Sequence, residues 1–167
     1  MDQGLYEAGY IMYSNLNNNS KKATCLIKLG KFQEALDSAI KADTSTTWKE
    51  LCIACMAVGE FKLAGIAGQH VIVHHDNLDE LITTYEKYGQ PFEMMKLLED
   101  GIAKGNAHVG IFTELGVLYA KYQPEKLMNH FHQYFLKINK SKLMRVCERY
   151  HHWAEARYLY IHYDEYD

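Results

Sequence analysis

The segment Val58-Gly59-Glu60-Phe61-Lys62-Leu63-Ala64 is the most informative part of the sequence, because it has the features of a helix end followed directly by a helix start. Glycine lets a helix end in a left-handed residue at no steric cost. The aromatic Phe61 then opens the next helix, and the small Ala64 one turn later permits close helix approach. The stretch therefore predicts a tight turn between two antiparallel helices.

The same pattern recurs along the chain with a period of about thirty residues, as in helical repeat proteins. Its other copies are Leu29-Gly30-Lys31-Phe32 with Ala35, Tyr88-Gly89-Gln90-Pro91-Phe92 with Met95, and Tyr150-His151-His152-Trp153 with Ala156. A weaker copy, which lacks the aromatic residue, is expected near Tyr122-Gln123-Pro124 with Leu127. A hairpin of this size cannot bury its apolar face alone, so the units should stack. We predict an all-α fold, a single α-solenoid segment over residues 1–167 that is part of a longer repeat array.

The turn residues are expected to be the packing residues of the repeat. Glycine should supply the left-handed turn at three places, and an aromatic side chain should fill an equivalent buried wedge between the helices of each hairpin. The glycines are Gly30, Gly59 and Gly89, and the aromatic residues are Phe32, Phe61, Phe92 and Trp153.

Apolar residues spaced three and four apart predict helices along the whole chain. Ile111, Leu115 and Leu118, for example, fall on one stripe, whereas the β-branched run at 71–73 is too short to indicate a strand. The expected helices are 3–14, 19–30, 31–42, 46–58, 60–74, 77–88, 91–104, 107–121, 124–138, 140–150 and 152–164.

Composition excludes several classes of protein. The chain has 167 residues, of which 48% are hydrophobic and 23% charged, so it should fold. Its net charge of −3 comes without a block of five or more like charges, which argues against a nucleic-acid binder, because such a protein needs a basic face or stripe. No stretch approaches the ~18 apolar residues of a membrane span, so we expect no direct membrane insertion. Four scattered cysteines are few for a disulfide framework and favour a reducing compartment.

Candidate chemistry is sparse. Cys52 and Cys55 have the spacing of a zinc or redox pair, but both lie in an apolar run and are expected to be buried, reduced core residues. His70 and His74 are one turn apart without an accompanying metal-ligand motif. No nucleophile elbow, phosphate loop or dinucleotide fingerprint is present. We therefore expect no cofactor, no metal and no enzymatic activity.

Several segments, in this order and spacing, resemble the proximal leg of clathrin heavy chains. They are Thr47-Trp48-Lys49-Glu50 with Cys52 and Cys55, followed by residues 60–64, 70–74, 78–82, 112–115, 153–155 and 163–167. The resemblance implies a structural scaffold of the clathrin coat, a leg segment that supports lattice assembly and light-chain binding in vesicle-mediated transport and endocytosis. The implied partners are clathrin light chain and other clathrin heavy chains, and the implied location is cytoplasmic, peripheral on coated pits and coated vesicles.

A second interpretation is a helical-repeat binding module of a vacuolar-sorting or tethering protein, built from the same repeat. A tetratricopeptide array would instead show a strict period of about 34 residues, which this sequence lacks. The remainder of the parent chain would separate the first two interpretations.

The resemblance also suggests where a light chain would bind. In this family the light-chain helix is acidic with apolar anchors, so lysines near the hairpin turns, beside apolar residues, are candidate contacts. They are Lys28, Lys31, Lys49, Lys121 and Lys126, with Trp48 as an anchor if its side chain is partly exposed. The alternative is that these lysines are solvated charges that keep the surface soluble.

Overall fold

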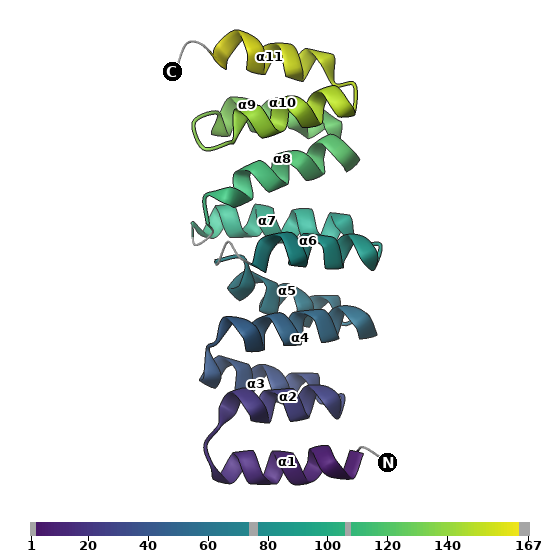
Figure 1. Ribbon diagram of the computed structural model, residues 1–167, viewed down its shortest axis with the longest axis vertical. Helices are drawn as coiled ribbons and strands as arrows, with labels where there is room; N and C mark the ends of the chain where they lie inside the picture. The colour runs from purple at the N-terminus through teal and green to yellow at the C-terminus, as the bar shows by residue number, and fades with distance from the viewer. Residues whose placement is uncertain (1–2, 74–76, 106–107, 164–167) are drawn as a thin grey trace. The chain divides into compact units, whose positions relative to one another are not determined.

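The computed structural model describes residues 3–73, 77–105 and 108–163. Over these ranges the chain is helical and contains no strand, which confirms the all-α solenoid class (Figure 1). The elements are α1 (Gln3–Asn15), α2 (Asn19–Lys28), α3 (Phe32–Ala42), α4 (Ser45–Val58), α5 (Phe61–Val71), α6 (Leu78–Lys87), α7 (Pro91–Lys104), α8 (Gly110–Tyr122), the short 3₁₀ helix η2 (Pro124–Lys126), α9 (Leu127–Tyr134), α10 (Lys140–Arg149) and α11 (Trp153–Tyr163). None of the described helices is both long and apolar enough to cross a membrane.

The predicted helices are found with boundaries that differ by a few residues, apart from the helix expected over 124–138. That segment begins as the 3₁₀ helix η2, and α9 ends at Tyr134. Tight i→i+3 turns are common at helix ends. Here they occur at both ends, since Lys126 N–H donates to the Gln123 carbonyl at 3.1 Å and Lys137 N–H to the Tyr134 carbonyl at 2.8 Å. The expected helix ends at 74, 107 and 164 lie outside the described residues.

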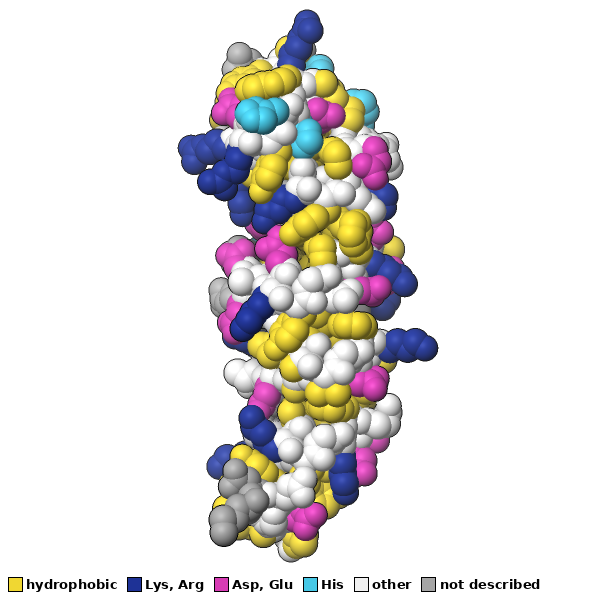
Figure 2. Space-filling model, turned by 90° about the vertical axis from the view of Figure 1, so that its right-hand side faces the viewer, with side chains coloured by type: hydrophobic (Ala, Val, Ile, Leu, Met, Phe, Trp, Pro, Cys, Tyr) yellow, Lys and Arg dark blue, Asp and Glu magenta, His cyan; other side chains and the backbone are white. Residues whose placement is uncertain are grey.

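The chain forms two compact units, Met1–Glu93 and Met94–Asp167. In the N-terminal unit successive helices stack in chain order: α2 packs on α1, α3 and α4, and α4 packs on α5 and α6 (Figure 1). Leu26, Leu51 and Leu81 are buried between these layers together with Tyr85. Hydrophobic side chains reach the drawn face of this unit in separate bands (Figure 2).

In the C-terminal unit α8 packs on η2, α9 and α10, and α10 packs on α11. The core consists of buried leucines and aromatic residues such as Leu115, Phe131 and Leu143. Gly116 allows α8 and α10 to approach closely, because a Cβ at this position would lie 2.9 Å from a Leu143 methyl group.

The four turns at which the repeat predicts a helix end share one hydrogen-bond pattern, the Schellman motif, in which a residue just beyond the helix donates to the carbonyl five residues earlier. The bonds are Lys31 to Leu26, Glu60 to Cys55, Gln90 to Tyr85 and His152 to Cys147, at 2.8–2.9 Å. The left-handed residue is Gly30, Gly59 and Gly89 in three turns, with φ of 75°, 87° and 69°. In the fourth turn His151 takes this place, with φ of 62°.

The predicted aromatic wedges are wrong for two of the four residues. Phe92 and Trp153 are 56% and 61% exposed, whereas Phe32 and Phe61 are half-buried. These side chains lie in the first turn of their helices, and Cβ atoms point toward the helix N-terminus, so the rings lie over the hairpin turn at the edge. The side chain three residues later is buried instead, as Ala35, Ala64, Met95 and Ala156 show.

Candidate functional site

An apolar groove lies on the surface of the N-terminal unit, along α2 and α4. Its volume is about 460 Å³. It is lined by Ile27, Lys28, Thr46, Lys49, Glu50, Ile53, Ala54 and Ala57. Most of the lining comes from positions of α4 that recur every three or four residues, which places them on one face of that helix.

The composition of α4 explains the groove. Leu51, Cys52 and Cys55 are buried on the core side of the helix. Ile53 is half-buried on the groove side, and the short side chains of Ala54 and Ala57 leave the space open. The floor is therefore apolar and partly exposed, which is the shape that an amphipathic helix can fill.

The charges at the rim are mainly basic. Lys28 is exposed in the last turn of α2. Lys49 forms an ion pair with Glu80 of α6. The carboxylate of Glu50 accepts a hydrogen bond of 2.9 Å from the Thr24 hydroxyl. An exposed ion pair such as that of Lys49 stabilises the fold by about 1 kcal/mol or less, so this lysine can exchange its carboxylate for one on a bound protein.

The predicted lysines are thus distributed over several places. Lys28 and Lys49 both line the groove, whereas Lys31 is exposed just before α3 and does not line it. Lys121 and Lys126 belong to the C-terminal unit and are exposed there.

The prediction that Trp48 serves as a surface anchor is wrong. Its side chain is only 2% exposed, and its indole Nε1–H donates to the Asp43 carboxylate at 3.1 Å. Trp48 lies on the core side of α4, while Ile53 lies on the groove side. Sequence reasoning missed Ile53, although the stripe of positions 46, 50, 53 and 57 contained the signal.

Cys52 and Cys55 are buried in the core, as predicted. The Cys52 thiol donates to the Ala64 carbonyl at 3.3 Å. Burial raises the pKa of Cys52 to about 12 and that of Cys55 to about 11. Both thiols therefore stay protonated at neutral pH, where a thiolate would be required of a nucleophile or metal ligand.

No metal site is found in the part of the chain that the structure describes. There, His, Cys, Asp and Glu side chains do not gather in groups of three or more that could hold an ion. His70 is on α5, and His74 lies outside the described residues.

A polar network in the C-terminal unit was not anticipated from the sequence. The Tyr119 hydroxyl donates to the Glu99 carboxylate at 2.6 Å, and the Lys126 ammonium lies 3.1 Å from the same oxygen. Partial burial of Glu99 opposes ionisation, but these two donors outweigh it and lower the pKa of the carboxyl group. Lys126 also lies over the Tyr119 ring, 5.6 Å from its centroid.

His130 adjoins this network in a cleft of about 310 Å³. Its Nε2 lies 2.7 Å from the Phe112 carbonyl oxygen, and burial lowers its pKa despite that bond. A neutral imidazole that donates to a backbone carbonyl is a packing element of the core.

The stacked hairpins with repeated Schellman turns define the class of protein, an α-solenoid built from short helical repeats. A family model described as "Region in Clathrin and VPS" matches residues 1–63 and 70–167. The chain belongs to this clathrin repeat family.

Individual clathrin heavy chains are similar to the chain over nearly its full length. It is 47% identical to the clathrin heavy chain of Dictyostelium discoideum, 48% to clathrin heavy chain 2 of Oryza sativa, and 41% to clathrin heavy chain 2 of Homo sapiens. Each comparison covers 166 residues, 99% of this chain and 10% of the relative. The chain thus spans about a tenth of the length of the curated relatives it matches.

Proposed function

We propose that the chain is a structural segment of a clathrin coat, a heavy-chain leg segment that supports lattice assembly in vesicle-mediated transport and endocytosis. The observation that carries this proposal is the 41–48% identity to clathrin heavy chains over 99% of the chain. The same similarity makes a vacuolar-sorting or tethering module the less favoured alternative. The segment works in the cytoplasm, on coated pits and coated vesicles, together with other clathrin heavy chains.

The physical properties of the fold support a structural role. Within each unit, neighbouring helices bury their apolar side chains against one another, so the unit is held by a dense core. In the proposed role the two units act as one segment, 1–167, of a longer repeat array. Contacts between such segments would be individually weak and gain strength from their number.

A chimera tests this role. The matching segment of the Dictyostelium clathrin heavy chain is replaced by residues 1–167, and purified chimeric protein is assembled into cages that are counted by electron microscopy. We expect cages to form. A chimera that is folded by circular dichroism and yet fails to assemble would contradict the proposal.

The groove along α2 and α4 is the proposed light-chain contact. An acidic helix with apolar anchors would place its anchors on Ile27 and Ile53 and its carboxylates near Lys28 and Lys49. Lys31 is a further proposed light-chain contact in the same unit, and Lys121 and Lys126 are separate proposed contacts on the C-terminal unit.

The groove is tested by titrating a clathrin light chain against the chain and two matched variants. Ile53→Asp puts a charge in the apolar floor, whereas Ile66→Asp puts it on an exposed isoleucine of α5 outside the lining. We expect Ile53→Asp to weaken binding at least about tenfold, or roughly 1.4 kcal/mol, and Ile66→Asp to leave it nearly unchanged. Equal affinities for both variants would exclude the groove and leave the coat role standing.

A further inference from the structure

The turn between α10 and α11 carries four consecutive aromatic side chains, Tyr150-His151-His152-Trp153, which we call the aromatic turn. Tyr150, His151 and Trp153 are exposed. The rings form two pairs. Tyr150 stacks on His152 with centroids 6.4 Å apart, and His151 lies against Trp153 with centroids 5.6 Å apart. The turn therefore presents aromatic rings to the solvent in a fixed arrangement.

The backbone of the aromatic turn is held by contacts with two helices. The His152 N–H donates to the Cys147 carbonyl of α10 at 2.8 Å. The His152 side chain contacts α8, because its Nε2 lies 2.8 Å from the Ala120 carbonyl oxygen. A ligand would meet a surface that is already ordered, which lowers the entropy cost of binding.

His151 distinguishes this turn from the other three Schellman turns. It has φ of 62°, in the left-handed region where those turns have glycine. A side chain in this region costs stability, and such residues are frequent at binding sites. The imidazole ring of His151 contacts the Trp153 indole, so this side chain restricts the positions that the indole can take.

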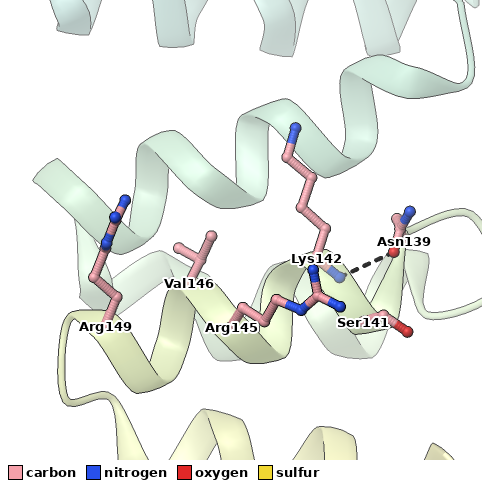
Figure 3. Close-up of a pocket in the computed structure, with 6 residues that line it drawn as sticks. All are labelled: Asn139, Ser141, Lys142, Arg145, Val146 and Arg149. Carbon is pink, nitrogen blue, oxygen red and sulfur yellow. Dashed lines mark hydrogen bonds between the residues drawn. The ribbon is translucent and has the colours of Figure 1, made fainter.

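The polar groups of the aromatic turn include unpaired donors. Neither the Trp153 indole N–H nor the Tyr150 hydroxyl has a hydrogen-bond partner in the part of the chain that the structure describes. Figure 3 shows Arg149 at the end of α10, directly before the turn, and its side chain is exposed. A matching ligand should combine apolar rings with carbonyl acceptors and should lack basic side chains.

A polyproline II segment has these properties. Proline has no N–H that would need an acceptor, its ring packs on aromatic side chains, and the carbonyl groups make no internal hydrogen bonds. Most carbonyl groups of a helix are bonded within the helix, so they cannot accept from an indole.

We propose that the aromatic turn binds a proline-rich segment of a partner protein. Proline rings pack on Tyr150 and Trp153, a backbone carbonyl of the segment accepts from the Trp153 indole N–H, and His151 positions that indole. This binding site goes beyond the coat role and does not overlap the groove along α2 and α4.

The probe is decaproline, which forms a polyproline II helix without a partner. It is titrated against the 167-residue chain and followed by tryptophan fluorescence. Of the two tryptophans, Trp48 is 2% exposed and Trp153 is 61% exposed, so a shift of the emission to shorter wavelength reports that Trp153 is covered. We expect a saturable shift with decaproline and no shift with a glycine–serine peptide of the same length. Absence of the decaproline shift would overturn the proposal.

Isothermal titration calorimetry compares the affinity of variants for decaproline. We expect Tyr150→Ala/Trp153→Ala to weaken binding at least about tenfold. The matched control is Tyr88→Ala/Phe92→Ala, which removes the exposed aromatic residues of the turn between α6 and α7. It should change the affinity less than about twofold. Equal losses in the two double variants would contradict a site at the aromatic turn.

His151→Gly separates binding from stability. Glycine adopts a positive φ without steric conflict, so this variant should unfold at the same temperature as the parent chain or a higher one. It also lacks the ring beside Trp153, and we expect it to bind decaproline at least about threefold more weakly. Unchanged affinity would overturn the positioning role of His151.

Two further measurements test the donor and the kind of partner. Trp153→Phe keeps a ring and removes the N–H, so its loss of affinity should be smaller than that of the double alanine variant. Vesicles of phosphatidylcholine test a membrane surface, because tryptophan and tyrosine also favour membrane interfaces. A Trp153 emission shift with vesicles and none with decaproline would overturn the proposal.

Discussion

The indole ring of Trp48 stacks on the imidazole ring of His70, with centroids 4.0 Å apart and planes only 3° apart. The two residues belong to α4 and α5, the helices of one hairpin, so the stack ties these helices together near the end opposite their turn. The hydrogen bond from Trp48 to Asp43 extends the contact to the residue that follows α3.

This arrangement predicts that Trp48→Ala destabilises the chain by about 3–5 kcal/mol, because a buried aromatic side chain is removed and a cavity remains. Trp48→Phe keeps a ring against His70 and loses the bond to Asp43, so it should cost less. Urea unfolding followed by circular dichroism measures both. An equal cost for the two variants would show that the ring stack contributes little.

A second prediction concerns the hydrogen bond between Tyr119 and Glu99. The folded-state pKa of Glu99 is lowered, so this interaction stabilises the chain above the unfolded-state pKa and is lost as pH falls through the folded-state value. Tyr119→Phe should therefore cost about 1 kcal/mol at neutral pH, an amount reduced by the partial exposure of Glu99, and less well below pH ~4.3. Unfolding free energies at the two pH values provide the measurement.

The matched control for Tyr119→Phe is Tyr150→Phe, which removes a surface hydroxyl of the same unit. Its effect on stability should be small and independent of acid pH. A pH-independent cost for Tyr119→Phe would contradict the assigned role of Glu99.

A third prediction concerns the hairpin turns. Gly59→Ala places a Cβ at φ of 87° and should destabilise the chain by roughly 1–2 kcal/mol. His151→Gly relieves the same steric conflict at φ of 62° and should be stabilising or neutral, despite the extra freedom of glycine in the unfolded chain. Thermal unfolding of both variants tests the sign. A stabilised Gly59→Ala would contradict the turn assignment.

A fourth prediction distinguishes residues that are buried between the helices of the repeat from residues that recur in its sequence pattern but are exposed. Trp153→Ala removes a ring that is largely exposed and should cost about 1 kcal/mol or less. Ala64→Leu forces extra atoms into a fully buried contact between helices and should cost about 1–3 kcal/mol. The denaturant midpoints of the two variants measure these costs. A larger loss of stability in Trp153→Ala than in Ala64→Leu would contradict this prediction and support the aromatic residue as the packing residue.

The helices and the turns between them could be predicted from the amino-acid sequence. These features depend on local interactions: apolar residues three and four apart select a helical face, and glycine ends a helix in the left-handed region. For this reason the positions of Gly30, Gly59 and Gly89 predicted the hairpins, and the order of sequence segments indicated the clathrin family. The helix start expected at position 124 was found, but the sequence did not indicate that the first turn there is a 3₁₀ helix.

Which side chains face the core and which lie together on the surface depends on packing between helices that are distant in the chain. Trp48 and Ile53 lie on the same helix, and a rotation of that helix about its axis would exchange their environments, so packing against α2, α5 and α6 had to select one. The exposure of Phe92 and Trp153 and the placement of Lys28 and Lys49 along the same groove have the same origin. Burial and proximity between helices depend on how whole helix faces pack together, and this packing cannot be predicted from residues that are neighbours in the chain.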